Sequence, residues 1–459
     1  MSTMPHMTLE NIIRVCKGTY FGDTALLSRE ISGAVMDSRQ IEEGFLFFPI
    51  RGERVDGHDF IPSVFEKGAL ATLSERELEN APGPYILVDS TTEAMKRLAA
   101  FYRESLDIKV VGISGSVGKT STKEMIASVL EQKYKVLKTA GNYNNEIGLP
   151  LTIFRIRKEH EVAVLEMGIS DFHEMHRLAA MAQPDVSVIT NIGLCHLENL
   201  GTRDGILQAK TEMFEHMPKG GTVILNGDDD KLCTRKVVNG KPTVFYGIQS
   251  SGLSEKRIYA TDIENLGFEG MKATIHTPQG EMEVLIPIPG EHNVYNALAA
   301  ASVGLELGES LEQIQAGIES AKTIAGRTNF IHTKGMIVID DCYNANPVSM
   351  EAALDILSHS KGRSIAVLGD MGELGTNEVA LHKGVGKIVA QKGIDVLFCA
   401  GTLAKEYAKE AQHATDVHYF ENHEDMTEAL VSFVREGDSI LVKASHFMEF
   451  PKVVEALTK

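Results

Sequence analysis

The residues with the clearest chemical potential form a short glycine-rich segment that ends in Lys119-Thr120-Ser121. An apolar run leads into it, and the loop between the two consists of Gly115, Ser116, Val117 and Gly118. Glycines let backbone N–H groups surround phosphate oxygens, and the start of a following helix adds a favourable dipole. Lys119 can then reach the β- and γ-phosphates, and the Thr120 hydroxyl can hold Mg²⁺. The segment predicts a nucleotide-phosphate site, although Ile113 replaces the first glycine of the usual GxxxxGK[ST] pattern; a solvated turn is the alternative.

Two further polar side chains follow apolar runs that are typical of strands. Glu166 ends the run VAVLE, and His196 comes shortly after VSVIT. Ligands of open parallel sheets bind at the carboxyl ends of the strands, and a carboxylate beside a phosphate loop is a suitable ligand for Mg²⁺. We therefore predict Glu166 as a metal ligand, with a salt-bridged strand-end carboxylate as the alternative. A lone histidine is more often structural, so only its position and its HLE context favour His196.

The segment GEHNVYNALAAASVGLELG is typical of a helix that ends at Gly308. Asn293 and Asn296 lie three residues apart, hence on one face of that helix. An asparagine amide both donates and accepts hydrogen bonds, as the edge of a purine requires; helix capping is the alternative. Ser310 and Gln313 then predict a capping box that opens another helix.

The elements that must position these residues alternate between short apolar runs and helical patterns, which indicates parallel α/β architecture. The predicted strands are 108–114, 162–166, 186–190, 223–226, 336–340, 364–368, 396–399 and 439–443. The first hundred residues contain shorter runs broken by Gly and Asp, typical of a small mixed α/β domain. We predict three domains, 1–104, 105–325 and 326–459, with a hinge near residues 322–329.

Composition excludes several classes of protein. The chain has 459 residues with 45 Lys and Arg against 63 Asp and Glu, so a net charge of -18 argues against nucleic-acid or anionic-membrane binding. No apolar stretch is long enough for a membrane helix, and the N-terminus does not resemble a secretion signal. Five cysteines without CxxC spacing are typical of reduced thiols in a cytoplasmic enzyme. A GTPase is disfavoured because no NKxD motif is present.

Taken together, the motifs resemble the Mur ligase family of ATP-dependent amide-forming enzymes. The pieces that carry the resemblance span nearly the whole chain: DSR…GER.DGHDF, GSVGKTSTKEM, GNYNNEIGLPLT, LEMGIS, TNIGLCHLENLGT, AKTEMF, GEHNVYNALAA, GRTN, IDDCYNANPVSM, LGDMGELG and LVKAS. The resemblance implies an N-terminal domain for a UDP-linked substrate, a central P-loop ATPase domain, and a C-terminal Rossmann-like, doubly wound domain that binds ATP and the incoming amine. Three of the motifs, DCYNANP, LGDMGELG and GNYNNEIG, resemble the members that add D-alanyl-D-alanine to UDP-N-acetylmuramoyl-tripeptide through an acyl phosphate, in peptidoglycan synthesis.

The resemblance also implies roles for individual residues. It implies two Mg²⁺ ions, with Thr120, Glu166 and His196 as ligands and with Lys210 carbamylated into an anionic ligand; an exposed helix lysine is the alternative for Lys210. It places Asn293 and Asn296 at the adenine, and Arg327 and Asp341 at ATP. It implies substrate-binding roles for Ser38, Arg39, Arg51, Asp56, His58, Asn144, Asn145, Tyr343, Asn344, Asn346, Lys443 and Ser445. For the first five of these, turn-forming polar residues are the alternative.

The sequence departs from the family pattern in a few places. Ala444 and His446 stand where we expect a glycine and an arginine, and Pro49 stands where we expect a small residue. The dipeptide pocket is the part that these departures put in question. Lysine and diaminopimelate both remain open as the third residue of the accepted peptide.

The sequence leaves two other functions open as alternatives. A sibling enzyme would add one amino acid to a muramoyl peptide, or glutamate to folate. A nucleotide-dependent switch protein would bind partners without releasing phosphate. The expected partners are otherwise small molecules, and we expect a monomer in the cytoplasm.

Overall fold

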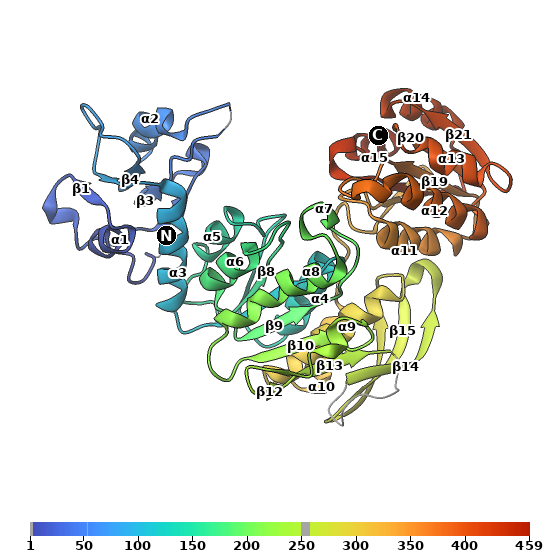
Figure 1. The fold of residues 1–459 in the computed structure, drawn as a ribbon, viewed down its shortest axis with the longest axis horizontal. Helices are drawn as coiled ribbons and strands as arrows, with labels where there is room; N and C mark the ends of the chain where they lie inside the picture. The colour runs from blue at the N-terminus through green and yellow to red at the C-terminus, as the bar shows by residue number, and fades with distance from the viewer. Residues whose placement is uncertain (1–2, 53, 249–257) are drawn as a thin grey trace.

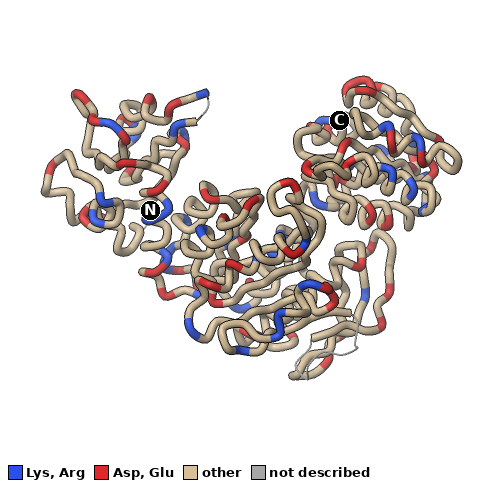
Figure 2. Tube along the Cα trace, in the orientation of Figure 1, with Lys and Arg blue, Asp and Glu red and all other residues tan. Residues whose placement is uncertain are grey.

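The computed structural model describes residues 3–52, 54–248 and 258–459, and its strands form three large sheets along the chain. Figure 1 shows the N-terminal sheet at one end of an elongated molecule, the central sheet in the middle, and the C-terminal sheet at the other end. Charged residues of both signs occur in all three parts (Figure 2). Glu53, which belongs to the first of the family motifs, lies outside the described residues.

The N-terminal part is a small five-stranded sheet with the order β1-β5-β4-β3-β2. Only β1 runs antiparallel to its neighbour. Its elements are α1 (Leu9–Cys16), β1 (Thr19–Phe21), β2 (Gly33–Val35), β3 (Phe45–Phe47), α2 (Ile61–Glu66), β4 (Ala71–Ser74), β5 (Tyr85–Leu87) and α3 (Thr91–Glu104). The α3 helix begins after Ser90, whose hydroxyl accepts from Glu93 N, and its buried face joins the core shared with the central sheet.

The central part is a nine-stranded sheet with the order β16-β15-β14-β13-β10-β9-β6-β8-β7. The strands are β6 (Lys109–Ser114), β7 (Val136–Lys138), β8 (Val162–Glu166), β9 (Val186–Ile189), β10 (Thr222–Asn226), β13 (Val244–Gly247), β14 (Ile258–Asn265), β15 (Met271–Thr277) and β16 (Gly280–Ile286). A separate small ribbon pairs β11 (Val237–Val238) with β12 (Lys241–Pro242). The helices are α4 (Lys119–Leu130), α5 (Gly148–Ile153), α6 (Glu174–Ala182), α7 (Leu197–Leu200), α8 (Arg203–Thr211), α9 (His292–Glu306) and α10 (Leu311–Glu319).

This central sheet is not wholly parallel, as we had expected it to be. The strands from β7 to β14 pair in parallel, but β15 and β16 extend the edge as an antiparallel meander. In both strands buried and exposed positions largely alternate, because one face packs on the core and the other faces solvent. Such alternation differs from the continuous apolar runs of buried parallel strands, which is why those runs alone did not reveal the meander.

The C-terminal part is a doubly wound six-stranded sheet with the order β17-β18-β22-β19-β20-β21, in which β17 alone is antiparallel. Its strands are β17 (Asn329–Thr333), β18 (Met336–Asp340), β19 (Ser364–Gly369), β20 (Val396–Ala400), β21 (Asp416–Phe420) and β22 (Ser439–Lys443). One face is covered by α11 (Pro347–Ser358), α12 (Glu378–Gln391) and α13 (Lys405–Ala411), the other by α14 (His423–Phe433) and α15 (Pro451–Thr458).

The predicted α/β fold class is confirmed, and each of the eight predicted strands is present within a residue or two of its expected bounds. The α9 helix ends just before Gly308, and the Ser310–Gln313 capping box has both of its hydrogen bonds. The boundaries at 104 and 325 stay predictions. In the described part of the chain, no helix combines the length and the apolar character needed to cross a membrane.

Candidate active site

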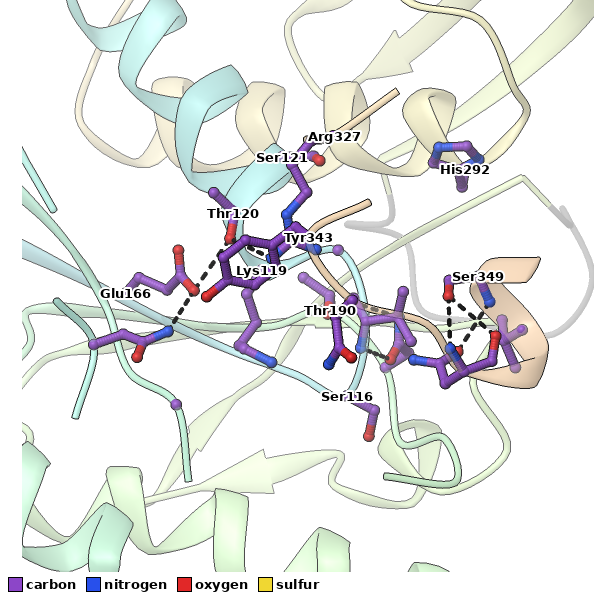
Figure 3. Close-up of a pocket in the computed structure, with 18 of the residues that line it drawn as sticks. Ser116, Lys119, Thr120, Ser121, Glu166, Thr190, His292, Arg327, Tyr343 and Ser349 are labelled. Carbon is purple, nitrogen blue, oxygen red and sulfur yellow. Dashed lines mark hydrogen bonds between the residues drawn. The ribbon is translucent and has the colours of Figure 1, made fainter. Parts of the chain in front are cut away.

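A cavity of about 760 Å³ lies where the carboxyl ends of the central strands face the loop that follows β18 of the C-terminal sheet. Most of the predicted site residues line it: Ser116, Val117, Gly118, Lys119, Thr120, Ser121, Asn144, Asn145, Glu166, His196, Asn296, Arg327, Asp341, Tyr343, Asn344, Asn346 and Lys443. These residues come from segments that are more than three hundred positions apart in the chain, and the fold brings them to one place (Figure 3). The volume is appropriate for a nucleotide with part of a second substrate.

The glycine-rich loop joins β6 to α4 as the sequence predicts, and its glycines are required by geometry. Gly118 has a φ of 83°, in the left-handed region that favours glycine, and it is the N-cap of α4. A Cβ at Gly115 would collide with the hydroxyl of Thr190. That hydroxyl donates to the carbonyl of Val117 at 2.6 Å, and Asn191 Oδ1 accepts from Val117 N at 2.9 Å.

Thr190 and Asn191 therefore shape the phosphate loop, and the sequence analysis assigned them no role. The available signal was the TNIG motif directly after a predicted strand, since strand ends face the crevice of such sheets.

Lys119 lies at the first turn of α4, with its ammonium inside the loop. Nζ donates to the carbonyl of Gly115 at 2.8 Å. Burial lowers the pKa of Lys119, while the carboxylate of Glu166 opposes that shift. The ammonium is thus held at the centre of the loop, where a phosphate would meet it.

Glu166 ends β8, and its carboxylate points toward Thr120 at the end of the phosphate loop (Figure 3). Its Oε1 accepts from Thr120 Oγ1 at 3.2 Å and from Asn144 Nδ2 at 2.8 Å. Its Oε2 is buried and has no hydrogen-bond partner among the described residues; the nearest cation is Lys123, whose Nζ lies 3.9 Å away. An unpartnered carboxylate oxygen beside a threonine hydroxyl offers hard oxygen donors, so these residues fit Mg²⁺.

His196 lies at the rim of the cavity and has a left-handed backbone, with a φ of 53°. Its Nδ1 lies 3.0 Å from Oε2 of Glu373, which reaches it from the C-terminal sheet. Burial lowers the pKa of His196, and Glu373 opposes that shift. Glu373 belongs to the LGDMGELG motif, but nothing in its spacing revealed that it would meet His196.

Lys210 is almost completely buried in α8, with an exposed fraction of 1%. Burial, with a smaller contribution from the positive charge of Lys119, lowers its pKa to about 8. The alternative of an exposed helix lysine is therefore wrong. Lys210 is not one of the residues that line the cavity.

The two predicted adenine-contacting asparagines bond to each other but line different pockets. Asn296 lines the cavity, but its Oδ1 accepts from Thr122 Oγ1 at 2.7 Å and its amide donates to Asn293 at 2.8 Å. Asn293 donates to the carbonyl of Pro289 and faces a smaller pocket next to the hinge. His292, which the sequence analysis did not select, lines both pockets.

Arg327 connects the hinge to the phosphate loop. Its Nη2 lies 3.5 Å from Thr120 Oγ1, and its guanidinium stacks 3.9 Å from the centre of the Tyr343 ring. The hinge backbone on either side is fixed to the C-terminal sheet, since Gly326 N donates to Asp340 and Thr328 N donates to Asp341. Arg327 therefore lies between two residues whose backbone is bonded to the C-terminal sheet, and its side chain reaches the phosphate loop.

The remaining C-terminal residues mostly pair with one another. Lys443 Nζ donates to Asp341 Oδ2 at 2.6 Å and to the carbonyl of Asn344 at 2.9 Å, and both side chains of the ion pair are largely buried. Asn346 is the N-cap of α11, in a capping box with Ser349. Ser445 accepts from Gly372 N at 2.8 Å and does not line the cavity.

The predicted residues of the N-terminal domain lie outside the cavity. Asp56 begins a short 3₁₀ helix by accepting from His58 N, and its carboxylate also contacts His58 Nδ1 at 2.7 Å. His58 is buried, and its Nε2 accepts from Glu75 N at 3.1 Å. Both ring nitrogens of His58 thus have partners within the domain, which favours the alternative of a turn-forming role for this residue. Ser38, which is partly buried, and Arg39, which is exposed, lie in a short 3₁₀ helix (Ser38–Gln40), and Arg51 is exposed next to Asp56.

Three family models match consecutive parts of the chain. They are described as Mur ligase family, catalytic domain (residues 30–103), Mur ligase middle domain (residues 113–304) and Mur ligase, glutamate ligase domain (residues 326–446).

Whole-chain relatives agree with these models. The chain is 37% identical to a UDP-N-acetylmuramoyl-tripeptide--D-alanyl-D-alanine ligase of Bacillus subtilis, with 98% of each protein covered. A crystal structure of MurF from Acinetobacter baumannii is 33% identical and superimposes with a TM-score of 0.90 over 100% of both chains. MurF ligase from Thermotoga maritima in complex with ADP is 31% identical, with a TM-score of 0.79, and covers 93% of this chain and 97% of its own. The chain is therefore an ATP-dependent ligase that belongs to the Mur ligase family.

Proposed function

We propose that this ligase joins D-alanyl-D-alanine to UDP-N-acetylmuramoyl-tripeptide, with conversion of ATP to ADP and phosphate, to form the pentapeptide precursor of peptidoglycan. The single observation that carries the proposal is the cavity, in which a phosphate loop, a carboxylate oxygen with no hydrogen-bond partner among the described residues and the loops of a second sheet face one another. The printed names of full-length relatives with more than 30% identity supply the substrates.

The first step activates the tripeptide. An oxygen of its terminal carboxylate attacks the γ-phosphorus of ATP, the bond to the bridging oxygen breaks, and ADP leaves with the electron pair. Lys119 and the N–H groups of the loop neutralise the transferred phosphoryl group, and Arg327 approaches it from the C-terminal side. The product is an acyl phosphate, which has a far better leaving group than a free carboxylate.

The second step forms the amide. The amine nitrogen of D-alanyl-D-alanine attacks the acyl carbon, the carbon–oxygen bond to phosphate breaks, and the amine releases a proton. The protein contributes mainly by holding the three substrates in line. The residues that we propose for the dipeptide are those of the loop after β18, Tyr343, Asn344 and Asn346, together with Lys443 and Ser445.

Magnesium and a modified lysine complete the proposal. Thr120, Glu166 and His196 would hold Mg²⁺, which shields the charge of the phosphates when bound. We propose that Lys210 is carbamylated, in keeping with the resemblance stated for AKTEMF. Its burial supports this, because a carbamate forms from a neutral amine and burial disfavours the ammonium form.

The three parts of the chain would divide the substrates. We propose that residues 1–104 take the UDP end of the peptide substrate, that 105–325 hold ATP, and that 326–459 hold ATP and the dipeptide. Figure 1 shows the first and third parts at opposite ends, so catalysis requires them to approach each other. Monomeric state and cytoplasmic location remain predictions; the five cysteines, all free, support a reducing compartment.

The test of the function is an acceptor screen. ATP, Mg²⁺ and one muramoyl tripeptide, with lysine or diaminopimelate in third position, are offered with D-alanyl-D-alanine or with single amino acids. We expect phosphate release only with a tripeptide and the dipeptide together. Rapid hydrolysis with neither substrate, or a preference for a free amino acid, contradicts the proposal.

The test of the carbamate uses Lys210→Ala. We expect nearly all ligase activity to be lost and short carboxylates added in solution to restore part of it, because they replace the missing anionic ligand. An active Lys210→Ala variant, or one that no short carboxylate rescues, refutes the carbamate without touching the choice of substrates.

A further inference from the structure

A second group of potential metal ligands lies on the flank of the central domain, away from the cavity. It consists of His176 on α6 and of Glu215 and His216 on the short 3₁₀ helix η4 (Glu212–His216) that follows α8. One ligand atom from each residue lies within 4.8 Å of the other two. We define these three residues as the flank triad. Among the described residues, no other group of three or more His, Cys, Asp or Glu side chains meets this distance criterion.

Hydrogen bonds alone do not satisfy the flank triad. His176 Nδ1 lies 3.0 Å from Glu215 Oε2 and 3.2 Å from His216 Nε2. A ring nitrogen carries either one N–H or one lone pair. As a donor, Nδ1 has one hydrogen to share between the carboxylate and a neutral His216 Nε2; as an acceptor from His216, it turns a lone pair toward the carboxylate. The two contacts therefore conflict in the absence of a cation, because they cannot both be full hydrogen bonds.

A metal ion removes this conflict because all three atoms then act as lone-pair donors. Zinc binds histidine nitrogen and carboxylate oxygen at about 2.0–2.2 Å, which places neighbouring donors of a tetrahedron about 3.3–3.6 Å apart. The two measured separations, 3.0 and 3.2 Å, are close to that edge. The two imidazole rings meet edge to face with centroids 4.4 Å apart, so that they do not stack over each other.

The backbone that carries the flank triad is fixed by a neighbouring buried carboxylate. Glu212, with an exposed fraction of 7%, accepts from His173 N and from His176 N, each at 3.2 Å. These N–H groups belong to the start of α6, which favours a negative charge. The Glu212 carboxylate thus holds α6 and η4 in the relative position that brings the three ligands together.

We propose that His176, Glu215 and His216 form a binding site for a divalent transition-metal ion, with Zn²⁺ as its probe. Two histidines and one carboxylate, with further positions open to water, are a donor set suited to Zn²⁺ and ill-suited to Mg²⁺. The open positions face solvent, since His176 and Glu215 are about half exposed or more. The site is separate from the Mg²⁺ ligands proposed above and does not depend on the choice of substrate.

The position of the flank triad gives the metal a structural role. Glu174 and Leu178 of α6 line the active-site cavity, and His176 projects from the other side of that helix, because successive residues are about 100° apart. The η4 helix continues directly from α8, which carries Lys210. Bound Zn²⁺ would therefore fasten α6, which lines the cavity, to η4 at the end of α8, and the structure shows these segments in contact (Figure 1).

The experiment uses the full chain without a histidine tag, with ADP and excess Mg²⁺ present so that the catalytic metal positions are occupied. Zinc affinity is measured by competition with an indicator dye. Three variants each remove one ligand, His176→Gln, Glu215→Gln and His216→Gln, and His413→Gln is the matched control because it removes an exposed histidine elsewhere.

We expect one equivalent of Zn²⁺ to bind, each ligand variant to weaken binding about tenfold or more, and the control to bind like the wild type. Zinc should also raise the Tm of the wild type and control, but not that of the ligand variants, which differ only at surface positions. The proposal is overturned if the protein retains no zinc, if the three variants bind it as well as the wild type does, or if the control loses as much affinity as they do.

Discussion

The two sides of the active-site cavity differ in how their polar groups are used. On the central side, the ammonium of Lys119 contacts only a loop carbonyl, and one oxygen of Glu166 has no hydrogen-bond partner within the described chain. On the C-terminal side, Lys443 pairs with Asp341, and Asn346 caps its own helix. The central side is thus ready for a charged ligand, whereas most groups of the C-terminal side are satisfied without one.

This difference indicates how the ligase can order its substrates. A buried charge whose hydrogen bonds are incomplete is costly, so the central side gains stability when ATP and Mg²⁺ supply further partners. The C-terminal side gains little until its own pairs are exchanged for contacts with ligand. ATP is therefore expected to bind first and chiefly to the central side, and the C-terminal side to engage as the domains close.

The largest effect is expected from Lys119→Met. Loss of the ammonium removes the main cation at the phosphate loop, so kcat/KM should fall by about 10³-fold while the fold is kept. Steady-state phosphate release measures it, with Lys219→Met as the control because Lys219 is exposed and distant from the loop in sequence. Equal losses in both variants would mean that the ammonium in the loop has no special role.

On the C-terminal side, Asp341→Asn tests whether the ion pair holds the site together. It leaves the buried Lys443 without its counter-charge and should lower the free energy of unfolding by about 3–5 kcal/mol. Urea denaturation measures this, and a second substitution, Lys443→Met, should restore much of the loss because no charge is then left unpaired. If the single variant is as stable as the wild type, the ion pair between Asp341 and Lys443 does not stabilise the C-terminal side.

Glu309 is a second buried carboxylate, and it can be compared with Glu166 because it lies outside the cavity. Glu309 is buried, and both of its oxygens lack partners among the described residues, but it does not line the cavity. Burial raises the pKa of Glu309 from 4.5 to about 7. The folded chain therefore keeps a proton that the unfolded chain has released, so this contribution to stability is present below pH 4.5 and is lost as the pH rises to about 7.

A side chain at this position that cannot ionise should therefore make the folded protein more stable above neutral pH. We expect Glu309→Gln to raise the free energy of unfolding at pH 8 by about 1–2 kcal/mol, to flatten its pH dependence, and to leave the ligase active. Glu166→Gln should instead abolish activity. The distinction fails if Glu309→Gln inactivates the enzyme or shows the same pH dependence as the wild type, as measured by denaturation across pH.

The smallest effect is expected where the two sides touch. Glu373→Gln weakens the contact with His196, but Glu373 is 65% exposed, so the free energy of unfolding should change by less than about 1 kcal/mol. ADP binding, measured by calorimetry, should be unchanged, because neither the loop nor Glu166 is affected. A large loss of ADP affinity would show that the C-terminal side takes part in the first binding step.

The sequence by itself determined the local features of this protein. The phosphate loop, the strand that ends at Glu166, the end of α9 and the Ser310–Gln313 capping box depend on neighbouring residues, whose types and spacing are visible in the chain. Asn346 was predicted to bind substrate, although Pro347 and Ser349 after it are the signature of a helix N-terminus. That local signal predicts the capping role that the structure shows, and the substrate-binding role of Asn346 stays a prediction.

Only the tertiary structure decided which distant side chains meet and which of them are buried. The contact of His196 with Glu373, the pairing of Asp341 with Lys443 and the burial of Lys210 join residues or surfaces that are far apart in the chain. The flank triad likewise joins α6 to η4 across some forty positions, so no spacing rule predicts it. The physical reason is that desolvation and hydrogen-bond satisfaction depend on everything that packs around a group, and packing is set by the whole chain.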